Sequence, residues 1–278
     1  IMGRSSHLGS QYHLAEQLPL IDVQEGDTVE IKFINQLWQP STIHWHGLPI
    51  PPEQDGNPMD PVPPGGLLEK LVRDVQKILL SPAERVEIIV DTLGQEGAIN
   101  LQAEPYNRGK MGHVAAEQNI NIASVNLITG QSIAVPETLR KIDDLGESKA
   151  VKKIVFTETM SMANGKHSMA FLLNGKSFDM DRIDFFSRLH EVELWEITNK
   201  SDMDHPFHVH GTQFQLVETE QNNIRTPAPY RAWKDTVNVR AGETVRIKIR
   251  QDYPGLRMLH CHILEHEVQG MMAMQQVK

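Results

Sequence analysis

The segment Thr244–Arg250 (TVRIKIR) decides the fold class, because its side chains alternate between apolar and charged types. Val245, Ile247 and Ile249 occupy alternate positions, with basic residues between and after them. Side chains two apart on a strand share a face, so this pattern predicts a strand with one buried face and one solvated face. Such a strand buries its apolar face against a second layer.

The same alternation recurs toward both ends of the chain. It is found in Thr28–Asn35, and shorter apolar runs occur at Glu84–Asp91, Lys153–Phe156 and Gln213–Val217. Clusters of turn-forming residues separate these runs. Short strands punctuated in this way predict β-sandwiches. Helical signals are few, and the charged segment Leu67–Leu80 is compatible with either helix or strand.

Composition excludes several classes of protein. The chain has 278 residues, a length typical of about two domains. Its 36 acidic and 27 basic residues give a net charge of −9, which argues against binding nucleic acid through phosphates. Hydrophobic residues at 40% are typical of a globular rather than a disordered protein. No apolar run approaches the roughly 18 residues that a membrane-spanning helix needs.

Histidine is the most informative residue type. Eight of the 13 histidines fall in three short windows: His44 and His46; His205, His208 and His210; His260, His262 and His266. The single cysteine, Cys261, lies between two of them. On a strand, His260 and His262 would project to one side and the Cys261 thiol to the other.

A thiolate, two histidines and a weak axial methionine form the ligand set of a blue-copper centre. The sequence offers Cys261, His266 five residues later and Met271 ten residues later. A second histidine must come from elsewhere, and His205 is the natural candidate. The sequence therefore predicts a copper site built on these four side chains.

The three His-x-His pairs supply six imidazoles, enough for several copper ions with two or three nitrogen ligands each. One pair alone would be weak evidence, since a strand can carry two histidines without a metal. Structural zinc uses four ligands and would leave most of these histidines unexplained. The others, which lack this spacing, are expected at the surface or in the core: His7, His13, His113, His167 and His190.

These residues resemble the multicopper oxidases, the family of laccases and bacterial cuprous oxidases. Four motifs carry the resemblance: His44–Leu48 (HWHGL), His205–Phe214 (HPFHVHGTQF), Trp233–Val237 (WKDTV) and His260–Glu267 (HCHILEHE). The similarity to the bacterial branch covers Asn174–Val277.

The resemblance implies an all-β fold of three tandem cupredoxin-like Greek-key β-sandwiches. Residues 1–66 would be part of the first domain, residues 67–147 part of the second with a linker, and residues 148–278 the third, which carries the type 1 copper. The family uses four His-x-His pairs, and this chain has three. We therefore expect an internal stretch to be missing near Gly66, which leaves the first two domains incomplete.

The resemblance also assigns the ligands. Type 1 copper would bind His205, Cys261 and His266, with Met271 axial; type 2 copper would bind His44 and His208; the binuclear type 3 site would use His46, His210, His260 and His262. Together these sites hold four copper ions when the absent pair is present.

Three acidic residues receive roles from the same resemblance. Asp55 and Glu267 match the family's acidic proton-relay positions. The alternative is a turn residue for Asp55 and a solvated charge for Glu267. Asp235 is expected near the type 1 site, either as a support for its ligands or as a structural residue.

The implied function is that of a laccase-like enzyme, which oxidises phenols or other small donors and reduces dioxygen to water. One alternative is a cuprous oxidase for copper tolerance, because thioethers suit Cu(I) and five methionines gather nearby: Met160, Met162, Met169, Met180 and Met203. The long Met-rich insertion of such enzymes is missing after Met162, which favours the laccase-like function. A non-enzymatic copper-binding cupredoxin is the other alternative. A periplasmic or extracellular location follows only from the resemblance.

Overall fold

The computed structural model describes residues 67–68, 72, 75–86, 96–109, 118–127, 139, 141–163 and 166–278. The predicted strand at Thr28–Asn35 lies outside these residues, as do the predicted site residues His44, His46 and Asp55. Most of the strand predicted at Glu84–Asp91 also falls outside them.

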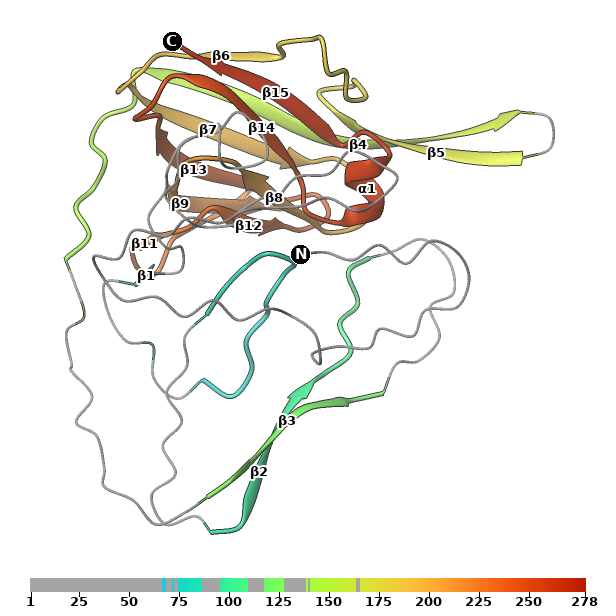
Figure 1. Cartoon of the computed structure of the whole chain (residues 1–278), viewed down its shortest axis with the longest axis vertical. Coiled ribbons are helices and arrows are strands. Elements are labelled where there is room, and N and C mark those ends of the chain that lie inside the picture. Colours follow the sequence, from blue (N-terminus) through green and yellow to red (C-terminus); the bar gives the residue numbers. More distant parts are fainter. Residues whose placement is uncertain are drawn as a thin grey trace, which may run out of the picture.

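Two packed sheets form the main body of the described structure (Figure 1). One has six strands in the order β10 (Ile224–Pro227), β9 (Phe214–Gln221), β13 (Thr244–Arg250), β7 (Val192–Asn199), β4 (Ala150–Ala163) and β5 (Lys166–Leu173). The other has five, in the order β12 (Thr236–Val239), β8 (His205–Val209), β14 (Gly255–Cys261), β15 (Met272–Val277) and β6 (Phe185–Ser187). The predicted all-β fold is confirmed.

Smaller elements complete the described structure. Strand β1 (Leu67–Leu68) pairs with β11 (Ala232–Trp233), and β2 (Ala98–Ala103) pairs with β3 (Ile120–Asn126). The short helix α1 (Leu264–Val268) follows β14. Within the described part of the predicted ambiguous segment Leu67–Leu80, two residues form β1 and the rest have no regular structure. No helix in the described part of the chain is long and apolar enough to cross a membrane.

Strand β13 has the bounds that the alternation predicts. It pairs antiparallel with β7 and β9, so it lies inside its sheet. Val245, Ile247 and Ile249 are fully buried between the sheets, whereas Arg246 projects to the outer face and pairs with glutamates of the flanking strands.

The core lies between the two sheets. It includes Trp195 of β7, Phe207 of β8, Phe214 of β9 and Leu259 of β14, all fully buried. Burial of each such side chain contributes roughly 1.5–3 kcal/mol to stability. Strands β8 and β14 pair with each other in the five-stranded sheet, so the histidines and cysteine that they carry are held on the packed core.

The β4–β5 hairpin extends beyond the core, and Figure 1 shows its outer end projecting from the sandwich. Ile154 and Phe156 of β4 are fully buried. Further along the same face, Met160 and Met162 are 56% and 69% exposed. One face of β4 therefore passes from the core to solvent.

Candidate metal centre

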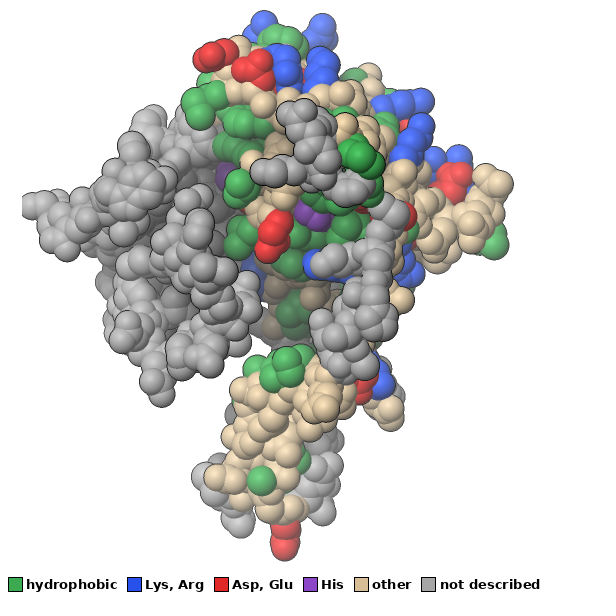
Figure 2. Space-filling view, turned by 90° about the vertical axis from the view of Figure 1, so that its right-hand side faces the viewer, with side chains coloured by type: hydrophobic (Ala, Val, Ile, Leu, Met, Phe, Trp, Pro, Cys, Tyr) green, Lys and Arg blue, Asp and Glu red, His purple; other side chains and the backbone are tan. Residues whose placement is uncertain are grey.

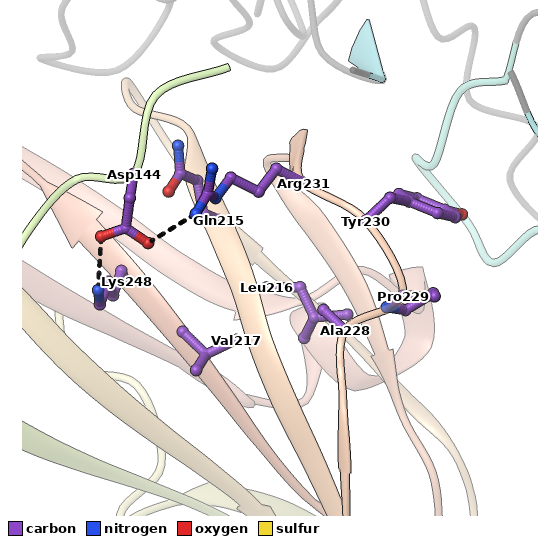
Figure 3. A pocket seen from close by; sticks show the side chains of 9 residues that line it. All are labelled: Asp144, Gln215, Leu216, Val217, Ala228, Pro229, Tyr230, Arg231 and Lys248. Carbon is purple, nitrogen blue, oxygen red and sulfur yellow. Dashed lines mark hydrogen bonds and ion pairs between the residues drawn. The ribbon is translucent and has the colours of Figure 1, made fainter. Parts of the chain in front are cut away.

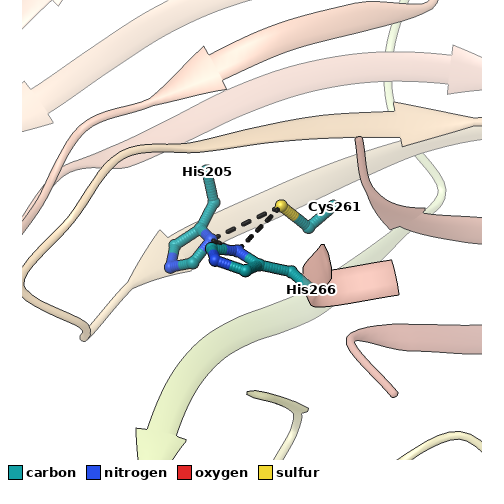
Figure 4. Close-up of side chains that lie close together, drawn as sticks. All are labelled: His205, Cys261 and His266. Atoms are coloured by element: carbon teal, nitrogen blue, oxygen red, sulfur yellow. Dashed lines mark hydrogen bonds between the residues drawn. The ribbon is translucent and has the colours of Figure 1, made fainter. Parts of the chain in front are cut away.

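A cysteine and two histidines converge at one end of the sandwich, and we call them the thiol cluster: His205, Cys261 and His266 (Figure 4). His205 begins β8, Cys261 ends β14 and His266 lies in α1. The Cys261 Sγ atom lies 3.4 Å from Nδ1 of His205 and 3.7 Å from Nδ1 of His266. The two Nδ1 atoms are 3.1 Å apart. Three donor atoms therefore face one another in a buried space.

Packing fixes the orientation of both imidazoles in the thiol cluster. The Phe171 ring stacks on His266 with 3.9 Å between ring centroids, and Phe156 lies 5.3 Å from His205. The helix that carries His266 has only five residues, so tertiary packing rather than helix propensity holds it in place.

Met271, the predicted axial ligand, is fully buried just after the same helix. Its backbone N–H donates to the His266 carbonyl over 2.9 Å, and its carbonyl accepts from the Cys261 N–H over 3.1 Å. The backbone of Met271 is therefore tied to two members of the thiol cluster.

Burial controls protonation in the thiol cluster. It lowers the pKa of His205 to about 3, with smaller contributions from His266 and Arg108, so this imidazole is neutral near pH 7. It raises the pKa of the Cys261 thiol to about 12. A neutral imidazole can bind a metal directly, whereas the thiol must release its proton, so metal binding here would liberate a proton.

Four histidines form a second group, the imidazole cluster: His208, His210, His260 and His262. Ligand nitrogens of the first three lie within 4.8 Å of one another. The Nε2 atoms of His210 and His260 are 3.0 Å apart, and the His262 ring centroid lies 5.5 Å from that of His208. Figure 2 shows only small patches of histidine surface among hydrophobic side chains on the face that it presents.

The tripeptide His260-Cys261-His262 joins the two clusters. The rings of His260 and His262 are 5.3 Å apart and lie with the imidazole cluster, while the Cys261 thiol faces His205 and His266. Adjacent side chains on a strand point to opposite faces, so this separation of the cysteine from the two histidines is expected at the end of β14. His262 lies in a bend just after β14, and His210 lies in a turn just after β8.

Asp235 and Thr236 orient His208. The His208 Nδ1 atom is 2.9 Å from the Asp235 carbonyl oxygen and 3.0 Å from Thr236 Oγ1. Since a carbonyl oxygen only accepts, Nδ1 carries the proton and Nε2 keeps its lone pair for a metal. Asp235 was expected near the type 1 site, and its backbone carbonyl contacts a histidine of the imidazole cluster.

Of the two predicted acidic relay residues, Glu267 is described and lies beside the imidazole cluster. Its Oε2 atom is 3.6 Å from Nδ1 of His260, and its side chain is partly exposed. That Nδ1 atom is also 3.0 Å from the Cys261 carbonyl oxygen. The Glu267 carboxylate is therefore placed between solvent and a histidine of the cluster.

Two residues at the outer edge of the thiol cluster were not predicted from the sequence. Ser201 Oγ lies 2.7 Å from Nε2 of His205, and Glu158 Oε1 lies 3.5 Å from the same nitrogen. The Glu158 side chain is only 9% exposed, and its Oε1 atom has no hydrogen-bond partner among the described residues. Burial raises the pKa of this carboxyl group. Only the spacing of Ser201, four residues before His205, could have suggested it.

A pocket of about 360 Å³ lies elsewhere in the described structure (Figure 3). Strand β9, residues 228–231, Asp144 and Lys248 line it, and Asp144 accepts a hydrogen bond from Lys248 over 2.7 Å. None of the predicted ligands that the structure describes lines this pocket, and its charged groups pair with each other. It adds nothing to either cluster.

Comparison with known proteins agrees with this geometry. Two family profiles described as multicopper oxidase match residues 15–72 and 150–278. The chain belongs to the multicopper oxidase family. It is 32% identical over 212 residues to a multicopper oxidase of Staphylococcus epidermidis, an alignment that covers 75% of this chain and 40% of the relative. A laccase of Bacillus subtilis is 29% identical over 230 residues, which cover 75% of this chain and 44% of the laccase.

A solved structure gives the same result for this chain. The multicopper oxidase of Campylobacter jejuni, described as a metallo-oxidase, superimposes with a TM-score of 0.61 and 39% identity. That match covers 66% of this chain and 41% of the other. The chain thus spans about two fifths of the length of the relatives it matches. Its all-β fold is cupredoxin-like.

The donor set of this chain fits copper. One thiol and a group of imidazoles, with a buried methionine beside the thiol, are the soft and borderline ligands that copper prefers. The thiol cluster is buried, as are His208, His210 and His260 of the imidazole cluster, whereas His262 is partly buried. No carboxylate of the described residues belongs to either cluster. A magnesium or calcium site would need oxygen ligands instead.

Proposed function

We propose that this protein is a laccase-like oxidase that couples one-electron oxidation of phenols or similar small donors to reduction of dioxygen. His205, Cys261 and His266 would hold type 1 copper, with Met271 as the axial ligand. The imidazole cluster, together with His44 and His46, would hold type 2 and type 3 copper: His44 and His208 for the former, and His46, His210, His260 and His262 for the latter. A periplasmic or extracellular location belongs to the same proposal.

One observation carries this proposal: consecutive residues of a single tripeptide belong to two different clusters. Copper at these clusters would supply one-electron oxidation of four donor molecules and the four-electron reduction of one dioxygen, with four protons, to two waters. Cys261 is bonded through the backbone to both His260 and His262, so this chain offers a short covalent path between the sites. A protein that only stored copper would not need this connection.

The side chains around the clusters have separable tasks. Phe156 and Phe171 exclude water from the thiol cluster by packing on its imidazoles. Asp235 and Thr236 hold the proton of His208 on Nδ1. Glu267 lies close enough to His260 to carry protons from solvent toward the imidazole cluster.

Copper loading followed by visible absorption and oxygen uptake tests the proposal. We expect an intense thiolate-to-copper band that is lost in Cys261→Ser, and oxygen uptake in the presence of a phenol. His190→Asn is a matched control, because His190 is an exposed histidine outside both clusters. Its φ of 62° is one that asparagine tolerates. A band that survives in Cys261→Ser would overturn the assignment.

A specific observation favours cuprous oxidation as a second candidate function. Alternation along β4 places Glu158, Met160 and Met162 on one face, and Met169 of β5 pairs with Met160. A carboxylate and three exposed thioethers thus lead outward from the His205 edge. Thioethers suit Cu(I), so this face could deliver that ion to the thiol cluster.

Replacing all three thioethers separates the two functions. The triple variant Met160→Leu, Met162→Leu, Met169→Leu keeps apolar volume but removes sulfur. If Cu(I) is the donor, we expect its KM to rise at least fivefold while the KM of a phenol is unchanged. Met180→Leu is the control, since Met180 is exposed outside this hairpin. Equal KM values for Cu(I) in all three proteins would exclude this second function.

A further inference from the structure

A turn from early in the chain is docked beside the imidazole cluster. Ser81 Oγ donates to the Glu84 side chain over 2.6 Å, and the Glu84 N–H donates to the Ser81 carbonyl over 3.0 Å, which closes the turn. Glu84 pairs with Lys234 over 2.7 Å, and Arg85 pairs with Asp235. Two ion pairs therefore fix this turn to the segment that contacts His208.

The Arg85 guanidinium binds the Asp235 carboxylate through two hydrogen bonds. Nη1 donates to Oδ1 over 2.7 Å and Nη2 donates to Oδ2 over 2.6 Å. Arg85 is partly exposed, whereas the Asp235 side chain is only 5% exposed. A two-point pair of this kind sets the plane of the carboxylate as well as neutralising it.

Arg85 and His208 are linked by a chain of hydrogen bonds through Asp235 and Thr236. Which atom donates in each bond follows from the donors and acceptors that each side chain has. Arginine only donates and a carboxylate only accepts. Thr236 Oγ1 donates its single proton to Asp235 Oδ1 over 3.1 Å, so toward His208 this hydroxyl can only accept. The His208 Nδ1–H is thereby supplied with two acceptors, the Thr236 hydroxyl and the Asp235 carbonyl.

We infer that Arg85 is a positioning residue for His208. By holding the Asp235 carboxylate in plane, it directs the Thr236 hydroxyl and so fixes the ring orientation and tautomer that leave the His208 Nε2 lone pair for a metal. The inference rests on the proposed copper cluster for its purpose, but the hydrogen-bond chain itself is a property of the metal-free protein. Partners of this kind typically change metal affinity by about 10–100-fold.

The first test follows the His208 ring in the copper-free protein by ¹⁵N NMR. In the unmodified protein we expect the pattern of a ring protonated on Nδ1. In Arg85→Met the Asp235 carboxylate loses its partner, and we expect the His208 nitrogen signals to shift or broaden. Arg85→Lys keeps the charge but not the two-point geometry, so its spectrum should lie between the other two. Unchanged His208 signals in Arg85→Met would overturn the inference.

The second test measures copper at the two clusters separately. We expect Arg85→Met to weaken copper binding at the imidazole cluster about tenfold in a chelator competition read by electron paramagnetic resonance. The visible band of Cys261 should be unchanged, which also shows that the variant is folded. Should Arg85→Met not fold, Arg85→Lys alone must show a weakened imidazole cluster for the inference to stand.

Lys234→Met is the matched control, because it breaks the other ion pair of the same turn without touching the Asp235 carboxylate. If this variant alters His208 as much as Arg85→Met does, docking of the turn rather than the carboxylate is responsible, and the inference is wrong. If Arg85 variants alter the His208 spectrum but no protein in the series binds copper at the imidazole cluster, the positioning role stands and the proposed function fails.

Discussion

Gly270→Ala is expected to destabilise the protein by about 2–3 kcal/mol and to disturb the thiol cluster. Gly270 has a φ of 102°, which costs an alanine roughly 1–2 kcal/mol. A Cβ there would also lie 2.1 Å from Ser177 Oγ and 3.2 Å from the Phe178 backbone nitrogen. The serine hydroxyl can rotate away but the backbone cannot, which adds about 1 kcal/mol. Met271 follows directly, so the strain falls on the predicted axial ligand.

Urea unfolding of the copper-free protein, followed by tryptophan fluorescence, to which the buried Trp195 contributes, measures this cost. Gly242→Ala is the matched control, because Gly242 has a φ of 73° and open space around its Cβ position. Its cost should be about 1 kcal/mol, from the backbone alone. If Gly270→Ala costs no more than Gly242→Ala and leaves the visible band of the copper-loaded protein unchanged, the reasoning is refuted.

Three further predictions concern protonation and chain length. Burial raises the pKa of the Glu158 carboxyl group above its ordinary 4.5. The contribution of Glu158 to the stability of the folded protein is therefore fully present below pH 4.5 and is lost as the pH rises through the folded-state pKa. Thermal melts of the copper-free protein should therefore show Glu158→Gln more stable than the parent at pH 7 and equal to it at pH 4; a lower Tm at pH 7 would contradict this. Glu267→Gln should slow oxygen uptake about 100-fold while the visible band persists, and undiminished uptake would remove Glu267 from the relay. Intact mass and peptide mapping should show a protein heavier than the 31.4 kDa of these 278 residues. A continuous peptide across Gly66–Leu67 would exclude a missing stretch there.

Local patterns predicted some of the described strands, namely β13 with its bounds and parts of β4 and β9. The bounds of Thr244–Arg250 agree because apolar alternation and its flanking turn are both properties of neighbouring residues. Helix α1 was not predicted, since five residues carry too little periodicity to register as a helix. Its existence depends on His266 and Ile263 being buried by other elements.

In the candidate site, too, the residues that could be predicted are those marked by the spacing of their sequence neighbours. Residues that join the site from distant parts of the chain could not be predicted. His-x-His spacing and the position of Cys261 indicated both clusters, because strand geometry places alternate residues on opposite sides. Glu158 could not be recognised, since one polar residue on an alternating strand carries no sign of what lies across the sheet. Arg85 and Asp235 are 150 residues apart, and only the folded chain brings them together.

The covalent link between the two clusters has a consequence for the kinds of mutation that the protein can tolerate. A substitution at His260 or Cys261 removes a donor from one site only. One residue inserted into or deleted from Gly255–Leu259, in contrast, would exchange the two sides of the strand end and misplace the thiol and its neighbouring imidazoles together. The length of β14 is therefore more tightly constrained than the identity of most of its residues. Insertions of amino-acid residues should be tolerated only outside this strand.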